Sequence, residues 1–269
     1  MRSSFLKAAA KQLWLPVVVI AALFALTAGS TSFYFPPFSQ MLGAMWTGLT
    51  EGELVGDLWF SLKNILVGLA LAIVAGVLLG LVIGERPTLR RATAPLLDFA
   101  RATPTIAFVP VIVLTLGIGA APKVFLIFLG ALWPILLNTI SGVESINPAV
   151  LETARSYRIP WWLRLRRVVL FGALPQIFAG IRVALSVAVV LMVVSEIYGS
   201  PIGLGNFILQ SGSSFAVPET WGGTILIGIL GYALSVVLLV IEFALLGWYH
   251  QRAPRAKAVR TMENEVTPA

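Results

Sequence analysis

The sequence has no cysteine, a single histidine and few charges, with 12% of its 269 residues charged. Without cysteine the chain forms no disulfide bond, no thiolate metal site and no cysteine nucleophile. A soluble globular domain carries about 25% charged residues, whereas 58% of this chain is hydrophobic. The composition therefore excludes an ordinary soluble fold and indicates a membrane protein.

Sequence motifs for catalysis are missing as well. No P-loop of the form G-x-x-x-x-G-K-[ST] occurs, so the sequence predicts no such ATP-binding site in this chain. The lone His250 lies beside Trp248, Tyr249 and Arg252, a grouping typical of the aromatic and basic belt at a membrane interface. We therefore expect no metal, no cofactor and no catalytic residue in the chain itself.

Long apolar runs dominate the sequence, and most of them suffice to cross a hydrocarbon core of about 30 Å. Inside a bilayer such runs satisfy their backbone hydrogen bonds as helices. Gly117–Lys123 supplies a turn in what is otherwise one continuous run. The predicted fold is an all-α polytopic membrane protein with six transmembrane helices, at about residues 13–29, 59–84, 104–119, 124–141, 178–198 and 221–248.

The first apolar run also resembles a signal peptide, because basic residues precede it and small residues follow it at Ala28–Ser30. A retained helix is the favoured interpretation, since the run is long for a signal-peptide core. Sequencing the N-terminus of the membrane-inserted protein distinguishes the two, because cleavage would give a start near Ser30.

Basic residues are distributed unevenly between the loops. Residues 30–58 contain three acids and no basic residue. Apart from Lys63 and Lys123, the basic residues lie in residues 1–12, 85–103, 142–177 and 249–269 or, as Arg182, just inside the fifth span. The positive-inside rule then predicts that both termini are cytoplasmic in a multi-pass cell-membrane protein. It also explains the net charge of +7 without a nucleic-acid partner.

This topology divides the chain into three parts. We expect a cytoplasmic N-terminus at residues 1–12, a transmembrane domain at residues 13–248 and a cytoplasmic tail at residues 249–269. The transmembrane domain contains one large cytoplasmic loop at residues 143–175, and the loop at residues 30–58 is predicted to be an amphipathic stretch on the outer interface.

Small residues recur in the second span, with Ala72, Gly76, Gly80 and Gly84 at every fourth position. Such a stripe lets two helix backbones approach closely. It predicts packing against a neighbouring helix, and flexing of the helix is the alternative.

Two acids and one irregular segment lie near the last spans. An acid at bilayer depth is costly and usually faces a cavity or a partner, so Glu196 is expected either to do this or to reach the interface. Glu242 is expected to pair with Arg252 or to extend to the cytoplasmic interface. Pro201–Pro218 is broken by glycines yet apolar, which predicts a re-entrant or surface segment.

A basic segment at residues 143–175 separates two apolar runs. Asn147 can cap a helix that runs to about Arg158. Pro160 breaks this helix and starts a second one, which we expect Pro175 to end. Taken alone, the pattern fits an interfacial helix held to anionic lipid or a short helix that docks on a soluble ATPase.

The same segment carries a family resemblance. Residues 152–157 (ETARSY), followed by residues 168–175 (VVLFGALP) and by Gly180-Ile181-Arg182, resemble the signature loop of ABC importer permeases. Residues 61–84, 95–119 and 203–205 resemble the sulfonate, taurine and nitrate branch, so the likeness covers about residues 59–248. In the signature loop, Thr153 replaces an alanine of the family pattern, Arg158 a glycine, and Phe171 the proline of many members.

The resemblance implies the fold and role of a type I ABC importer permease. Such a subunit translocates a small solute, here a sulfonate-, taurine- or nitrate-like anion or a pyrimidine-type compound, which an external binding protein delivers. ATP and Mg²⁺ are then bound by separate ABC ATPase subunits beneath a homodimer of the permease. The residues implied in ATPase coupling are Glu152, Thr153, Ala154, Arg155, Tyr157, Arg158, Ile159 and Pro160. Candidates for lining the translocation pathway are Glu196, Gly203, Gly205 and Gln210.

Two rival classes are weighed against this interpretation. An ATP-independent secondary transporter or channel subunit is expected to place ionisable groups inside the membrane. A membrane-embedded enzyme needs titratable residues that converge at one depth. Few intramembrane charges and one histidine make both classes less well supported than the permease.

Overall fold

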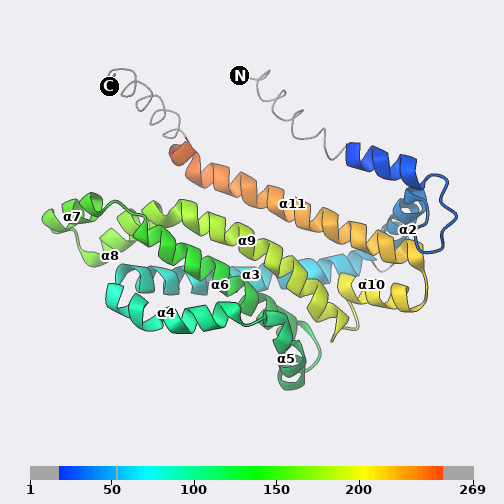
Figure 1. The fold of residues 1–269 in the computed structure, drawn as a ribbon, viewed down its shortest axis with the longest axis horizontal. Coiled ribbons are helices and arrows are strands. Elements are labelled where there is room, and N and C mark those ends of the chain that lie inside the picture. The colour runs from blue at the N-terminus through cyan, green and yellow to red at the C-terminus, as the bar shows by residue number, and fades with distance from the viewer. Residues whose placement is uncertain (1–17, 53, 251–269) are drawn as a thin grey trace, which may run out of the picture. The chain divides into compact units, whose positions relative to one another are not determined.

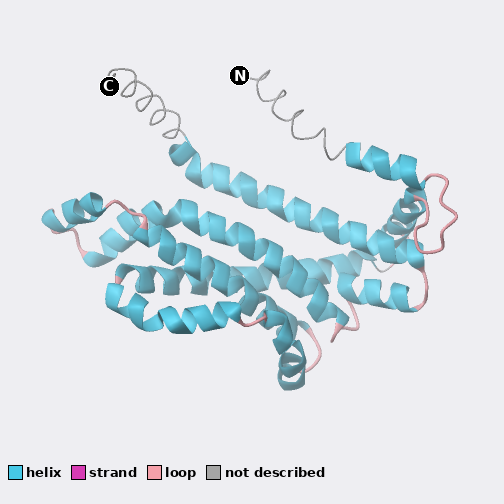
Figure 2. Ribbon diagram, in the orientation of Figure 1, coloured by secondary structure: helices cyan, strands magenta, loops and turns pink. Residues whose placement is uncertain are grey.

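The computed structural model describes residues 18–52 and 54–250, with side chains to residue 247. In these ranges the chain is helical and contains no strand (Figure 2). A short apolar helix spans Val18–Thr27. It is followed by α2 (Phe38–Thr50), α3 (Leu54–Glu85), α4 (Pro87–Ala102), the 3₁₀ helix η1 (Thr105–Phe108), α5 (Val109–Leu116), α6 (Ala120–Glu144), α7 (Pro148–Ser156), α8 (Trp161–Arg164), the π-helix η2 (Leu165–Val169), α9 (Leu170–Ile197), α10 (Leu204–Ser213) and α11 (Val217–His250) (Figure 1).

Four of the described helices are long and apolar enough to cross a membrane. They are α3, α6, the continuous helix Trp161–Ile197 and α11, and they confirm the predicted second, fourth, fifth and sixth spans. In the first predicted span, residues 18–27 are helical, and residues 13–17 lie outside the described residues. The predicted segment 1–12 and tail residues 251–269 also lie outside them.

The third predicted span, at residues 104–119, is helical over Thr105–Leu116 but is not a single long helix. α5 has only eight residues, and α4 meets the η1–α5 segment at a bend of 78°. Pro104 explains the bend, because a proline disfavours helical geometry at the preceding residue, and Thr103 is extended with ψ 121°. The bent pair is a broken span or a re-entrant loop, which gives up to five spans in the described residues.

The prediction that Pro175 ends a helix is wrong, because Pro175 lies inside α9. Proline removes one backbone hydrogen bond from a helix interior. The neighbouring Ala173 and Ile177 are buried, and burial of a helix face contributes more to helix stability than local propensity does. Packing of these buried residues therefore stabilises the helix on both sides of Pro175.

Two compact units make up the chain, residues 1–61 with 201–229 and residues 62–200 with 230–269. In the first unit, α2 contacts the start of α11, where a Cβ at Gly222 would lie 3.0 Å from Met45 N. The predicted amphipathic stretch is thus partly the helix α2, which buries Phe38 and Met41. The Trp221 indole donates to Tyr34 O at 3.0 Å, which joins the loop before α2 to α11.

The second unit is built around α6, which packs against both α3 and α9 (Figure 1). A Cβ at Gly76, Gly80 or Gly84 would lie 2.9 Å from Ile135 Cγ2, 2.5 Å from Thr139 Cβ and 2.8 Å from Val143 Cβ, respectively. The contacts advance four residues along each helix, so α3 and α6 run parallel. The structure thereby confirms packing as the role of the small-residue stripe.

Candidate functional site

α7 is a short helix whose first turn is fixed by two residues. The Asn147 side chain accepts a hydrogen bond from Ala149 N at 2.9 Å, and Pro148 occupies the first helical position. Asparagine at the cap satisfies a backbone N–H that the helix itself leaves unpaired, and proline is preorganised for the position that follows. This confirms the predicted start of the helix.

The other end of α7 is closed by a Schellman motif. Arg158 has φ 50°, its N–H donates to Arg155 O at 2.8 Å, and the Ile159 N–H donates to Ala154 O at 3.1 Å. These two bonds satisfy carbonyl groups at the helix end, and the motif needs a left-handed residue after the cap, usually glycine. The geometry therefore explains why the family pattern has glycine where this chain has Arg158.

The surface of α7 is almost entirely exposed. Only Ala154 is buried, at 4% exposure. Val150 and Tyr157 are 48% and 79% exposed, and Glu152 and Arg155 are exposed beside them. The helix thus presents a mixed apolar and charged face that the described residues do not cover.

α8 follows immediately and is held to the end of α3. Pro160 precedes α8 as its cap residue, which confirms that it breaks the first helix and starts a second. Trp161 Nε1 donates to Glu85 Oε2 at 3.0 Å, and the Arg164 guanidinium lies 3.7 Å from Glu85 Oε1. The predicted loop residues are therefore brought together as α7, a tight turn and α8.

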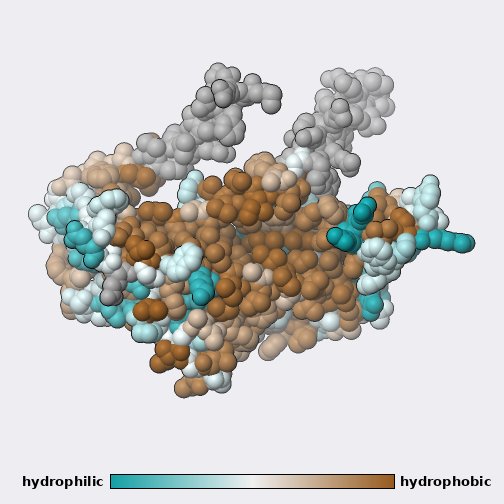
Figure 3. Space-filling model, turned by 180° about the vertical axis from the view of Figure 1, so that it is seen from behind, coloured by the Kyte–Doolittle hydropathy of each residue, from teal (hydrophilic) through white to brown (hydrophobic). Residues whose placement is uncertain are grey.

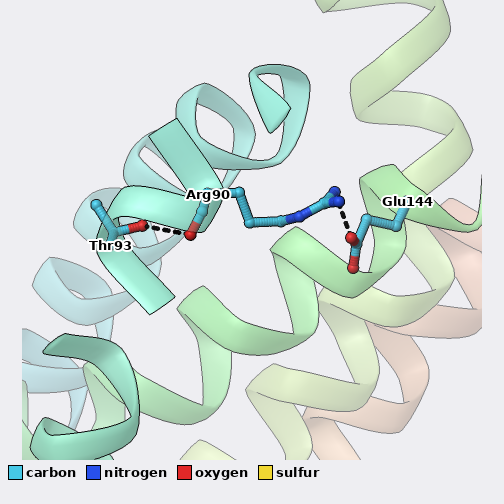
Figure 4. Close-up of polar contacts among 3 residues, drawn as sticks. All are labelled: Arg90, Thr93 and Glu144. Atoms are coloured by element: carbon cyan, nitrogen blue, oxygen red, sulfur yellow. Dashed lines mark hydrogen bonds and ion pairs between the residues drawn. The ribbon is translucent and has the colours of Figure 1, made fainter. Parts of the chain in front are cut away.

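A second ion pair lies at the same end of this unit, between Arg90 of α4 and Glu144 of α6 (Figure 4). Thr93 donates to Arg90 O at 3.3 Å and to Leu89 O at 2.9 Å, within the first turns of α4. Figure 3 shows hydrophilic side chains gathered at the α7–α8 end of the second unit, beside apolar helix surfaces. Both ion pairs, Arg90 with Glu144 and Arg164 with Glu85, thus lie at this end of the helices.

The four candidate pathway residues are divided between the two units. Glu196 is fully buried in α9. Gly203 and Gly205 are buried at the start of α10, whereas Gln210 is exposed and its Nε2 lies 3.5 Å from Asn206 Oδ1.

α10 begins in a backbone conformation that its neighbours fix. Gly203 has φ 115° and its N–H donates to Asp57 Oδ1 at 2.6 Å, while Leu204 N–H donates to Ser61 Oγ at 3.0 Å. The predicted re-entrant or surface segment is therefore a short helix capped by two side chains from the first two turns of α3.

Sequence reasoning missed the environment of Lys123. Its side chain is 1% exposed, and its ammonium donates to Gly119 O at 2.6 Å and to Gly199 O at 2.9 Å. It also interacts electrostatically with Glu196. The available signal was a lysine at the start of an apolar run, where a buried ammonium requires a partner.

The expected partner of Glu242 was Arg252, which lies outside the described residues. Within the described residues, Glu242 of α11 pairs with Arg182 of α9 at 2.5 Å. The two side chains are 15% and 56% exposed. Glu242 is thus neutralised by the neighbouring span.

The geometry up to this point defines a class: an all-helical, multi-pass membrane subunit with a protruding helical element between two spans. In the described residues, no group of three histidine, cysteine, aspartate or glutamate side chains could hold a metal ion. A family model for the inner membrane component of binding-protein-dependent transport systems matches residues 72–247, and the chain belongs to this family.

The sequences of known relatives support the same family assignment. The chain is 30% identical over 200 residues to a putative aliphatic sulfonates transport permease protein, SsuC of Bacillus subtilis, covering 74% of this chain and 72% of the relative. It is 29% identical over 221 residues to the taurine transport system permease protein TauC of Escherichia coli, covering 80% of both chains. The protein is therefore a permease subunit of an ABC importer, and not itself an enzyme.

Solved structures support the same fold. A structure of the inward-facing MetNI methionine ABC transporter aligns with a TM-score of 0.63 and 21% identity, covering 71% of this chain and 95% of that chain. An amino acid ABC transporter aligns with a TM-score of 0.54 and 14% identity, covering 74% and 93%. Family membership decides against a secondary carrier, a channel or a membrane enzyme. It implies that this chain is a multi-pass inner-membrane protein with ATPase and binding-protein partners.

Proposed function

We propose that α7 and the turn after it form the coupling element on which the ATPase subunits dock. The observation that carries this is a helix closed at both ends by its own caps yet exposed on nearly its whole surface. A rigid helix with exposed Val150 and Tyr157 beside charged side chains suits a protein partner better than a lipid surface. An exposed apolar patch with a polar rim marks such an interface.

Within this element the eight signature residues have separate roles. Glu152, Arg155 and Tyr157 are exposed contacts, and Thr153 supports the helix because its hydroxyl donates to Ala149 O at 2.7 Å. Ala154 is buried, and its small side chain allows close packing against its neighbours. Arg158, Ile159 and Pro160 set the angle at which the chain leaves α7.

The element is proposed to face the cytoplasm, with both chain termini on the same side. The positive-inside distribution supports this, since residues 85–103 and 142–177 are both basic. Glu85 at the end of α3 and Trp161 of α8 are hydrogen-bonded, so the two basic segments belong to one end of the second unit.

The proposed cycle is mechanical. Two copies of the chain form a homodimer over two ATPase subunits, and ATP-driven closure of those subunits displaces α7. The helices then rock between inward-open and outward-open arrangements. Glu196, Gly203, Gly205 and Gln210 are the residues we assign to the pathway that opens and closes.

The proposed substrate is a small solute of the sulfonate, taurine or nitrate kind, or a pyrimidine-type compound. This follows the names of the relatives, which are permeases for sulfonates, taurine and nitrate. We assign the small-anion class first, because all three named solutes are small anions or zwitterions with an acidic group.

The test uses the assembled transporter in proteoliposomes with its binding protein and taurine as the probe. Glu152→Lys and Ala154→Trp should abolish uptake and uncouple ATP hydrolysis from the binding protein, without changing membrane insertion. Asp98→Lys is the matched control, since Asp98 is a 65% exposed acid on α4. Undiminished uptake in both α7 variants would falsify the coupling role, and sulfonate, nitrate and pyrimidine probes decide the substrate class.

A further inference from the structure

Glu85, the last residue of α3, binds α8 through both oxygens of its carboxylate. Oε2 accepts the hydrogen bond from Trp161 Nε1 at 3.0 Å, and Oε1 lies 3.7 Å from the Arg164 guanidinium. The side chains of Glu85 and Arg164 are 13% and 19% exposed, so solvent screens this pair less than an open surface pair. One carboxylate thus holds two side chains that lie one helical turn apart.

The junction between α7 and α8 leaves little freedom. The N–H groups of Arg158 and Ile159 bond back to α7, and the N–H groups of Leu163 and Arg164 both bond to Pro160 O at 3.0 Å. The ring of Pro160 fixes its own φ. A displacement of α7 therefore moves the first turn of α8 with it.

The covalent route from α8 into the membrane helices is less regular. η2 is a π-helix, in which Leu170 N–H bonds to Leu165 O, and such segments often occur at functional sites. Pro175 interrupts α9 further along. Contact through Glu85 bypasses both irregular points and reaches α3 directly.

α3 is closely packed at this point. Gly84, the neighbour of Glu85, approaches Val143 of α6 so closely that a Cβ would lie 2.8 Å from Val143 Cβ. Well-packed protein interiors transmit strain because they hold few voids. A displacement applied at Glu85 therefore acts on α3 and α6 together.

We propose that Glu85 is a positioning residue of the transport cycle, which makes the end of α3 follow α7 through Trp161 and Arg164. The inference rests on the proposed coupling role of α7 and deepens it by naming the residue that passes the motion on. Chain connectivity alone would pass the displacement of α7 through α8 and η2 to α9. The contact through Glu85 displaces α3 as well.

Two other ion pairs in the same unit serve as matched controls. Arg90 with Glu144 joins α4 to α6, and Arg182 with Glu242 joins α9 to α11. Neither pair includes a residue of α7 or α8. A purely structural effect of losing an ion pair would appear in Glu144→Gln as well as in Glu85 variants.

The motion is measured as the distance between two spin labels. Because the chain contains no cysteine, a label can be attached at a chosen position through an introduced cysteine. Val82→Cys on α3 and Ser156→Cys on α7 are both at exposed positions. They are placed in one permease copy of the full transporter, with cysteine-free ATPase subunits. The label distance should stay constant between the ATP-free and Mg-ATP–vanadate states in the parent and in Glu144→Gln, and should change between these states in Glu85→Ala. A constant distance in Glu85→Ala overturns the inference.

The functional readout is the stimulation of ATP hydrolysis by the external binding protein. We expect Glu85→Ala to reduce this stimulation about tenfold, which is typical of a coupling free energy between two sites. The charge-exchanged variant Glu85→Arg with Arg164→Glu should recover part of it, and Glu144→Gln should retain it. Full stimulation in Glu85→Ala, or an equal loss in Glu144→Gln, overturns the inference.

Glu152→Lys separates this inference from the proposed function. If Glu152→Lys uncouples the transporter and Glu85→Ala does not, α7 couples by another route and only the role of Glu85 is wrong. If neither variant uncouples it, both proposals are wrong.

Discussion

The ammonium of Lys123 donates a hydrogen bond to the carbonyl oxygen of Gly199, 76 residues further along the chain. The bond joins the first turn of α6 to the residues that follow α9. Carbonyl groups at a helix C-terminus carry the negative end of the helix dipole, and Glu196 adds a full negative charge nearby. These groups offset the cost of a buried ammonium at the N-terminus of α6.

Removing the charge of Lys123 should destabilise the protein strongly. Lys123→Met keeps the length of the side chain but removes the positive charge that interacts with the buried Glu196, and removing one partner of a buried charge pair costs about 3–5 kcal/mol. The measurement is thermal unfolding in detergent. The double variant Lys123→Met with Glu196→Gln should be more stable than Lys123→Met alone, and an additive loss in the double variant would contradict the pairing.

A methyl group added to the α3–α6 contact should also destabilise the protein. Gly80→Ala forces the helices apart, because the new Cβ would lie 2.5 Å from Thr139 Cβ, and overpacking typically costs about 1–3 kcal/mol. The matched control is Gly228→Ala in α11, where a Cβ would meet nothing within 4 Å. Equal melting temperatures for the two variants would argue against close packing at Gly80.

Glycine at position 158 should stabilise the end of α7. Arg158 adopts a left-handed conformation with φ 50°, which costs a non-glycine residue about 1–2 kcal/mol. Arg158→Gly removes this strain, while the β-branched Arg158→Val increases it. Amide hydrogen exchange over residues 148–160 should be slower in the glycine variant and faster in the valine variant, and the reverse order would refute the Schellman geometry.

Loss of the carboxylate of Asp57 should destabilise the first turn of α10. Asp57 Oδ1 accepts the hydrogen bond from Gly203 N at 2.6 Å, and removing such a capping contact typically costs about 1 kcal/mol. Hydrogen exchange over residues 203–213 should therefore accelerate in Asp57→Ala. Glu51→Ala, which removes an exposed acid just after α2, should leave that rate unchanged.

Much of the fold followed from local patterns. Apolar runs predicted the spans over α3, α6, α9 and α11, because a chain in lipid has to satisfy its own backbone. Asn147 and Pro160 predicted where α7 and α8 begin, since capping and the missing proline N–H act within a few residues. The resemblance of residues 152–157 predicted the family that the comparisons confirm.

The wrong prediction at Pro175 has a physical cause. Pro175 was expected to end a helix, yet it lies inside α9, whereas a bend of 78° lies at Pro104. A proline sets only local geometry, and the packing of neighbouring helices decides whether the chain continues or turns. Glu242 pairs with Arg182, 60 positions earlier in the chain, since pairing depends on proximity in space.

The sequence by itself determined an all-helical membrane protein with a basic, proline-bounded segment between two spans, because composition and short-range patterns suffice for that, and its resemblance to ABC importer permeases supplied the family. Tertiary structure alone decided that Lys123 is buried against α9, that Glu85 holds α8, and that α3 and α6 run in parallel contact. Those relationships join residues about 60 to 80 positions apart, and they arise because burial in a helix bundle selects partners by distance in space.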